Sequence, residues 1–168
     1  MQPSTIYLSL GSNVGDRGAN LRMAIAKLGD VGVRVRKTSA IYETQPVDFL
    51  EQRWFFNCVV EAETEREPLA LLTALREIET AMGSKKLIAK GPRLIDIDLL
   101  FYGDQTIHTP ELQVPHPRMA QRRFVLVPLA DLAPDFRHPA SGLTVSEMLK
   151  DTSDTSDVRK IMGQDVSV

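Results

Sequence analysis

Four segments of the chain have the hydrophobic pattern of β-strands, and two segments between them have the pattern of helices. Alternating or continuous apolar residues predict strands over residues 5–10, 31–42, 55–62 and 95–102. Turn-forming residues at 11–16 follow the first strand, so a loop connects it to the first helix. We expect the strands to form one sheet that the two helices cover.

The two helices are predicted from apolar residues spaced three and four positions apart. The apolar stripes are Leu21, Ala24, Ile25 and Leu28 in the first helix, and Leu72, Leu75, Ile78 and Met82 in the second. We expect Gly29 to end the first helix, because glycine is common just past a helix end. Pro68 suits the first turn of the second helix, and Gly83 is expected to end it.

The order strand, helix, strand, strand, helix, strand predicts an α+β fold, the ferredoxin-like β-α-β-β-α-β sandwich, with extra C-terminal elements. We interpret residues 1–168 as a single domain. Residues 124–132 form a short apolar element, and a capping box between Thr144 and Glu147 predicts a last helix. The polar composition that follows predicts a mobile tail over residues 151–168.

Composition and charge narrow the partners that we expect. The net charge of −2 provides no basic field for nucleic acid, and no apolar run is long enough to span a bilayer. Cys58 is the only cysteine, which excludes an internal disulfide and fits a cytoplasmic chain. The N-terminus lacks the features of a secretion signal. We therefore expect a cytoplasmic monomer that acts on small molecules, without a nucleic-acid or membrane partner.

Two carboxylates, Asp96 and Asp98, lie two residues apart in an apolar run. In a strand their side chains share one face, while Ile95, Ile97 and Leu99 share the opposite face toward a core. Adjacent carboxylates repel each other, and Mg²⁺ would relieve this repulsion because it prefers oxygen ligands, including those of phosphates. The pair indicates phosphoryl chemistry. The alternative is a strand with one solvated face that happens to carry two aspartates.

Two groups of cationic residues flank the acidic pair in the sequence. They are Lys85, Lys86, Lys90 and Arg93 before it, and His116, Arg118, Arg122 and Arg123 after it. The chain has neither a Gly-x-x-x-x-Gly-Lys-Ser/Thr loop nor Gly-x-Gly-x-x-Gly, so side chains and metal would have to hold the phosphates of a bound ATP. Any one of these cations is simply explained as a solvated surface charge, but two groups around one acidic pair favour phosphate binding.

Two long motifs carry a resemblance to a known family. Residues 91–102 (Gly-Pro-Arg-Leu-Ile-Asp-Ile-Asp-Leu-Leu-Phe-Tyr) and residues 114–126 (Val-Pro-His-Pro-Arg-Met-Ala-Gln-Arg-Arg-Phe-Val-Leu) closely resemble the two signatures of the 6-hydroxymethyl-7,8-dihydropterin pyrophosphokinase family. Shorter blocks at residues 8–13, 42–46 and 55–57 also fit the family pattern. The resemblance runs over nearly the whole chain.

The resemblance implies an enzyme of folate biosynthesis that transfers the terminal diphosphate of ATP to the hydroxymethyl group of a dihydropterin and releases AMP. Asp96 and Asp98 would hold two Mg²⁺ ions, with ATP as co-substrate. Arg93 and Arg122 are implied as further catalytic residues. The implied ATP-binding residues are Glu79, Lys85, Lys86, Arg93, Ile97, His116, Arg118 and Arg122.

By the same resemblance, the pterin is held between aromatic rings and by hydrogen bonds at its edge. Phe55 and Phe124 would supply the rings and Asn57 an amide that can both donate and accept. The full implied set is Thr44, Gln45, Pro46, Val47, Phe55, Asn57, Asp96 and Phe124. Without the motif, a place in the core would be the simpler explanation for the two phenylalanines.

The loop at residues 84–90 departs from the family pattern. Enterobacterial-type members carry a Trp and two Arg just before the Gly-Pro-Arg motif, whereas this loop carries lysines and is one residue shorter. Lys90 takes the Trp position, so we expect closure over ATP to differ, because lysine neither stacks nor grips phosphate with two parallel bonds. Trp54, in the loop before the third strand, is a candidate to close over the pterin instead.

Two other functions fit part of the pattern. A nucleotidyltransferase also pairs a Gly-Ser loop with an Asp-x-Asp strand and two metal ions, but it would release pyrophosphate instead of AMP. A non-catalytic ferredoxin-like module would bind RNA or a small ligand without turning over ATP. The sequence lacks the paired aromatic strand motif of RNA-binding sheets, which argues against RNA as the ligand.

Overall fold

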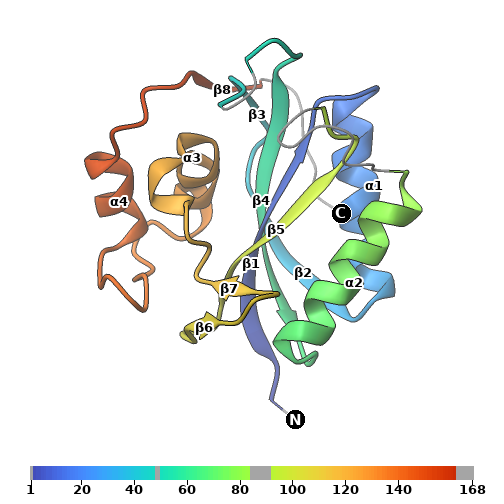
Figure 1. Cartoon of the computed structure of the whole chain (residues 1–168), viewed down its shortest axis with the longest axis vertical. Helices are drawn as coiled ribbons and strands as arrows, with labels where there is room; N and C mark the ends of the chain where they lie inside the picture. Colours follow the sequence, from blue (N-terminus) through green and yellow to red (C-terminus); the bar gives the residue numbers. More distant parts are fainter. Residues whose placement is uncertain (1, 48–49, 84–91, 162–168) are drawn as a thin grey trace.

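The computed structural model describes residues 2–47, 50–83 and 92–161, which form a sheet with helices on both faces (Figure 1). Within these residues the main sheet has six strands. They are β1 (Ser4–Ser12), β2 (Val33–Thr38), β3 (Tyr42–Thr44), β4 (Phe55–Thr64), β5 (Asp96–Tyr102) and β8 (Val158–Lys160), and β6 (Ile107–His108) pairs separately with β7 (Gln113–Val114). The helices are α1 (Arg17–Asp30), α2 (Pro68–Ala81), the 3₁₀ helix η1 (Met119–Gln121), α3 (Arg123–Leu132) and α4 (Val145–Asp151).

The strand order confirms the predicted ferredoxin-like fold. The sheet runs β5-β1-β4-β3-β8, and β2 also pairs with β4. All of these pairings are antiparallel. Strands β2 and β3 together fill the place of the single strand predicted at residues 31–42, because the chain leaves the strand conformation at residues 39–41.

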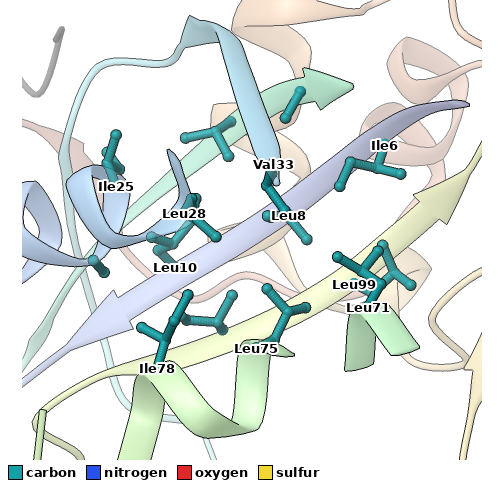
Figure 2. Close-up of a cluster of buried hydrophobic side chains, with 14 of the residues drawn as sticks. Ile6, Leu8, Leu10, Ile25, Leu28, Val33, Leu71, Leu75, Ile78 and Leu99 are labelled. Atoms are coloured by element: carbon teal, nitrogen blue, oxygen red, sulfur yellow. The ribbon is translucent and has the colours of Figure 1, made fainter. Parts of the chain in front are cut away.

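The first core lies between the sheet and helices α1 and α2. Ile6, Leu8 and Leu10 of β1 are fully buried there, and Figure 2 shows them in one cluster with apolar side chains of the two helices, such as Leu28 and Leu75. Ile97 and Leu99 of β5 join the same cluster. The apolar face predicted for this strand is therefore confirmed, and it leaves the opposite face of β1 and β5 to the second side of the molecule.

Both predicted helices form on this face of the sheet, but the first helix ends later than predicted. Gly29 lies inside α1, which continues to Asp30, so the prediction that Gly29 ends the helix was wrong. Gly32 follows the C-cap residue Val31 and has φ +80, the left-handed conformation in which a helix commonly ends. Helix α2 begins at Pro68 as predicted.

The buried stripe of α2 is shifted slightly from the predicted one. Leu75 and Ile78 are buried as predicted, whereas Leu72 and Met82 are only partly buried. Leu71 is fully buried at the start of the stripe, and a carboxylate residue, Glu79, is buried at its other end.

The second core lies on the opposite face of the sheet, under α3 and α4 (Figure 1). Residues 124–132, predicted only as an apolar element, are helical and bury Val125, Leu126 and Leu129. An irregularity in the β1–β5 pairing leaves Leu100 without a partner residue on β1, and both Leu100 and Phe101 join this second core. The predicted capping box of α4 is present at its N-terminus.

The segment after α4 returns to the sheet. We expected residues 151–168 to form a mobile tail, but Val158–Lys160 forms β8 and pairs with β3 at the edge of the sheet (Figure 1). Sequence patterns missed this strand because it has only three residues, of which Val158 is half-buried and the two charged residues after it are exposed, so it carries too little hydrophobic signal. None of the helices in the described part of the chain is long and apolar enough to cross a membrane.

Candidate active site

A cavity of about 240 Å³ opens on the α3 side of the sheet. Strands β1, β3, β4 and β5 contribute to it, together with the start of α3 and the loop before that helix. Its lining residues are Ser9, Gly11, Thr44, Gln45, Pro46, Val47, Gln52, Phe55, Asn57, Arg93, Asp96, Asp98, His116, Arg122 and Phe124. Every residue predicted to bind the pterin and every predicted catalytic residue therefore contributes to one cavity.

The acidic pair enters the cavity from β5. Asp96 and Asp98 lie opposite Gly11 and Ser9 of β1, on the face that points away from the first core. The Asp98 side chain is only 31% exposed. Burial and the neighbouring Asp96 carboxylate raise the pKa of the Asp98 carboxyl to about 7, although Arg76 opposes them. Two carboxylates held this closely disfavour each other's charge, so the site favours a cation.

Side chains of helix α2 contact the strand that carries the acidic pair. A Glu79 carboxylate oxygen accepts a hydrogen bond of 2.8 Å from the backbone N–H of Ile97, between the two aspartates. The other Glu79 oxygen lies 2.5 Å from Arg76, whose guanidinium is 3.9 Å from Asp98. Glu79 and Ile97, which we predicted to bind ATP, are not among the described residues that line the cavity. Glu79 instead satisfies a backbone donor of β5.

Arg76 is a supporting residue that sequence patterns did not single out. Its side chain is 37% exposed, and it lies on α2 one turn before Glu79. The three-residue spacing of an arginine and a glutamate was the available signal. That signal predicts a pair on a helix surface, but not the approach of the pair to Asp98.

The cationic side of the cavity contains Arg93, His116 and Arg122. The backbone of Arg93 is fixed by Asn13, whose side-chain oxygen accepts from Arg93 N at 2.8 Å and whose own backbone N–H donates to Arg93 O at 3.0 Å. Asn13 also donates to the side-chain oxygen of Gln52 at 2.9 Å. This asparagine thus connects two segments that line the cavity.

His116 is uncharged at neutral pH. Burial and the cationic neighbours Arg122 and Arg118 lower its pKa to about 4. Its Nδ1 accepts a hydrogen bond of 3.2 Å from the backbone N–H of Arg118, so the ring proton lies on Nε2, which can donate. His116 therefore offers a hydrogen bond to an anion and leaves the positive charge to the arginines.

Arg118 lies outside the main cavity. It lines a second cavity of about 520 Å³, which shares Gln45, Pro46, Val47 and Arg122 with the first. The predicted residues Lys85 and Lys86, and the whole loop at residues 84–90, lie outside the residues that the structure describes.

Aromatic and amide groups form the remaining side of the main cavity. Phe55 and Phe124 are only partly buried and both line it, so core packing alone does not explain them. The Asn57 side chain is buried and donates to the hydroxyl of Thr44 at 2.6 Å. A Cβ atom at Gly11 would lie 2.5 Å from Asn57 Oδ1, so glycine is needed there for the close approach.

Trp54 is not among the described residues that line the cavity. The Arg159 guanidinium lies 4.9 Å from the centre of the Trp54 ring. The carbonyl oxygen of Trp54 accepts a hydrogen bond of 2.8 Å from the Arg17 side chain. The described contacts thus hold Trp54 beside β8 rather than over the pterin residues. Ser9, Gly11 and Gln52 are lining residues that the predicted site did not include.

These features define a ferredoxin-like fold whose main cavity, among the described residues, combines two carboxylates with arginine side chains and an aromatic wall. A family model described as 7,8-dihydro-6-hydroxymethylpterin-pyrophosphokinase matches residues 7–134. The chain belongs to this family.

Curated relatives include both short and long proteins. The 2-amino-4-hydroxy-6-hydroxymethyldihydropteridine pyrophosphokinase of Bacillus subtilis is 45% identical over 127 residues, which cover 75% of this chain and 76% of that protein. The folic acid synthesis protein fol1 of Pneumocystis carinii is 41% identical over 157 residues, which cover 94% of this chain. This match is only 21% of the Pneumocystis protein, so the chain spans about a fifth of that relative's length.

Solved structures support the fold. The wild-type HPPK-DHPS of Plasmodium falciparum has a TM-score of 0.71 and 18% sequence identity to this chain. The match covers 89% of this chain and 44% of the Plasmodium chain. At this level of identity the likeness concerns the fold alone.

Proposed function

We propose that this chain transfers the terminal diphosphate of ATP to the hydroxymethyl group of 6-hydroxymethyl-7,8-dihydropterin and releases AMP, as a step of folate biosynthesis. One observation carries the proposal. In a chain that belongs to the pyrophosphokinase family, a single cavity combines the acidic pair, three cationic or imidazole side chains and an aromatic wall with a buried amide. Each group matches one part of the two substrates.

The acidic pair fits magnesium chemistry. Mg²⁺ is bound by oxygen ligands and usually shares its coordination with phosphates and water. Among the described residues, no three His, Cys, Asp or Glu side chains are close enough together to hold a metal ion. Asp96 and Asp98 would therefore supply only part of the coordination of two Mg²⁺ ions, and triphosphate oxygens and water would complete it. When bound, the ions would neutralise charge on the transferred phosphate.

The chain's own residues would bind, orient and neutralise the substrates. Arg93 and Arg122 would hold phosphate oxygens, because the guanidinium group forms paired hydrogen bonds with them. Neutral His116 would donate from Nε2 to a phosphate oxygen. Phe55 and Phe124 would stack on the pterin, and Asn57 would hydrogen-bond to its edge. Positioning and charge neutralisation would then carry most of the catalysis.

Three further expectations belong to the proposal. We propose that the chain works as a monomer, that it is cytoplasmic, and that it has neither a nucleic-acid nor a membrane partner. The net charge of −2 and the single cysteine are the observations that favour these expectations.

Phosphorus NMR of the purified chain with ATP, Mg²⁺ and 6-hydroxymethyl-7,8-dihydropterin tests the function. We expect AMP and a pterin diphosphate in equal amounts. Pyrophosphate release with a nucleotidylated acceptor would contradict the proposal and indicate a nucleotidyltransferase. Unchanged ATP with folded protein would contradict it as well.

A matched pair of variants tests the role of the acidic pair in the same assay. Asp98→Asn keeps the size of the side chain but removes its charge, so we expect turnover to fall at least 100-fold. Asp104→Asn removes the same charge at an exposed turn and should leave turnover unchanged. Equal activity in the two variants would rule out Asp98 as a metal ligand.

A further inference from the structure

Residues 152–161, which we call the C-terminal segment, contact two sides of the main cavity. Figure 1 shows this part of the chain running from α4 past α3 to β8 at the edge of the sheet. The segment contacts the first residue of α3 and the residues that follow β3. The walls of the cavity at these two places come from parts of the chain that are remote in sequence.

The first contact holds the start of α3. The Asp154 carboxylate accepts a hydrogen bond of 2.7 Å from the backbone N–H of Arg123, which is 31 positions away in the sequence. The first N–H groups of a helix have no partner within the helix, and a carboxylate there also interacts favourably with the helix dipole. Within the described residues, the N-cap residue Arg122 supplies no side-chain cap of its own. Asp154 therefore takes the place of a local cap.

A second hydrogen bond strengthens the same contact. The Arg123 side chain donates from Nε to the carbonyl oxygen of Ser156 at 3.1 Å. The Asp154 carboxylate is itself oriented by Ser156, whose backbone N–H and hydroxyl both donate to Oδ1, at 2.9 and 2.6 Å. Burial alone would raise the pKa of Asp154, but the hydrogen bonds from Ser156 and Arg123 outweigh it and leave this pKa below its usual range. The group is thus charged at neutral pH.

The other contact holds the residues after β3. The backbone N–H of Gln45 donates to the carbonyl oxygen of Asp157 at 3.0 Å, and the Gln45 side-chain oxygen accepts from Asp157 N at 3.2 Å. Thr44 pairs with Val158 in the β3–β8 ladder. Thr44 and Gln45 both line the cavity. The C-terminal segment is therefore fixed on one side of the cavity while Asp154 reaches the other.

We propose that Asp154 is a positioning residue, which fixes the first turn of α3 and thereby places Arg122 and Phe124 for catalysis. Arg123, which Asp154 holds, lies between these two lining residues in the sequence. The effect of this positioning on turnover rests on the proposed function, since Arg122 is expected to hold phosphate and Phe124 the pterin. A mere stabilising role would affect unfolding but not the kinetic constants of the folded enzyme.

The test compares Asp154→Ala, Asp154→Asn and the control Asp151→Asn in the full chain. Asp151 is exposed at the end of α4, so its variant removes the same charge without touching α3. Well below the melting temperature, we expect Asp154→Ala to raise the KM for the pterin at least fivefold and to lower kcat at least fivefold. Asp154→Asn keeps one acceptor oxygen, so its KM and kcat should lie between those of Asp154→Ala and wild type. The control should match wild type.

A readout that needs no turnover accompanies the kinetics. Amide hydrogen exchange at Arg123 should become at least tenfold faster in Asp154→Ala, because its N–H loses its acceptor. Unchanged exchange, or unchanged kcat and KM in folded variants, would overturn the proposal. If Asp154→Ala does not fold, Asp154→Asn and Ser156→Ala decide the question by the same criteria. An inactive wild type would refute the proposed function, while the exchange rates would still decide whether Asp154 holds α3.

Discussion

Replacement of Gly11 with alanine would place a methyl group against the Asn57 side chain inside the cavity. Gly11 pairs with Asn57 across β1 and β4, and the new Cβ would lie 2.5 Å from Asn57 Oδ1 and 3.6 Å from a Phe55 ring carbon. The backbone at Gly11 is ordinary strand, so alanine is allowed by conformation and the effect is steric. The substitution therefore acts on the proposed pterin amide without touching a charged group.

The size of the effect follows from how firmly Asn57 is held. A contact of 2.5 Å must lengthen by about 1 Å to reach van der Waals distance, but Asn57 is buried and its amide donates to Thr44 at 2.6 Å. Overpacking of this kind costs about 1–3 kcal/mol. Binding of the pterin needs the Asn57 amide in its original position, so the displaced side chain must return against the methyl group and this cost is incurred on binding. Because about 1.4 kcal/mol corresponds to a factor of ten in affinity, we expect the Kd for the pterin to rise roughly 5- to 150-fold.

Isothermal titration calorimetry of each substrate measures this effect directly. Gly11→Ala should weaken binding of the pterin and leave the Kd for ATP within about twofold of wild type. Gly29→Ala is the matched control, since Gly29 lies within α1 and an added Cβ there meets nothing within 4 Å. This control should bind normally and gain up to about 1 kcal/mol of stability. An unchanged Kd for the pterin in folded Gly11→Ala would refute the assignment of Asn57 to the pterin.

Two further predictions concern charge at the site. Arg122→Ala should slow single-turnover diphosphate transfer at least 100-fold while changing the Kd for the pterin less than tenfold, and an equal loss in both would contradict a role on phosphate. The second prediction is a pH effect on the metal-free protein. The raised pKa of Asp98, about 7, means that the folded protein binds more protons than the unfolded chain between about pH 4 and 7, so this residue's contribution to stability falls as the pH rises through that range. Asp98→Asn should therefore gain about 1–3 kcal/mol relative to wild type between pH 5 and pH 8 in urea unfolding, and a constant difference would show that Asp98 titrates normally.

Sequence patterns predicted the parts of the site whose geometry is local. In β5 the period of two residues determines which side chains share a face, so the alternation alone separated Asp96 and Asp98 from the core residues Ile97 and Leu99. The capping box at Thr144 was equally local, since its two hydrogen bonds join residues three apart. The resemblance to the family then supplied the residues from other segments.

Predictions failed where the local pattern was compatible with more than one structure. Gly29 was expected to end the first helix, yet α1 continues to Asp30, and Gly32 is the glycine that adopts the left-handed conformation. The segment 124–132 was too short and too apolar for its period to distinguish a helix from a strand.

The groups that support the site were the hardest to predict, because their contacts connect distant parts of the chain. Arg76 approaches Asp98 only because α2 packs beside β5. Asp154 contacts Arg123 only because β8 completes the sheet next to β3 and brings the preceding residues against α3. A substrate-binding residue must carry a side chain suited to its chemistry, whereas a supporting residue needs only one hydrogen bond in the right place, so many sequences can provide it. Site residues are therefore recognisable by type and spacing, and the residues that position them become visible only in the folded chain.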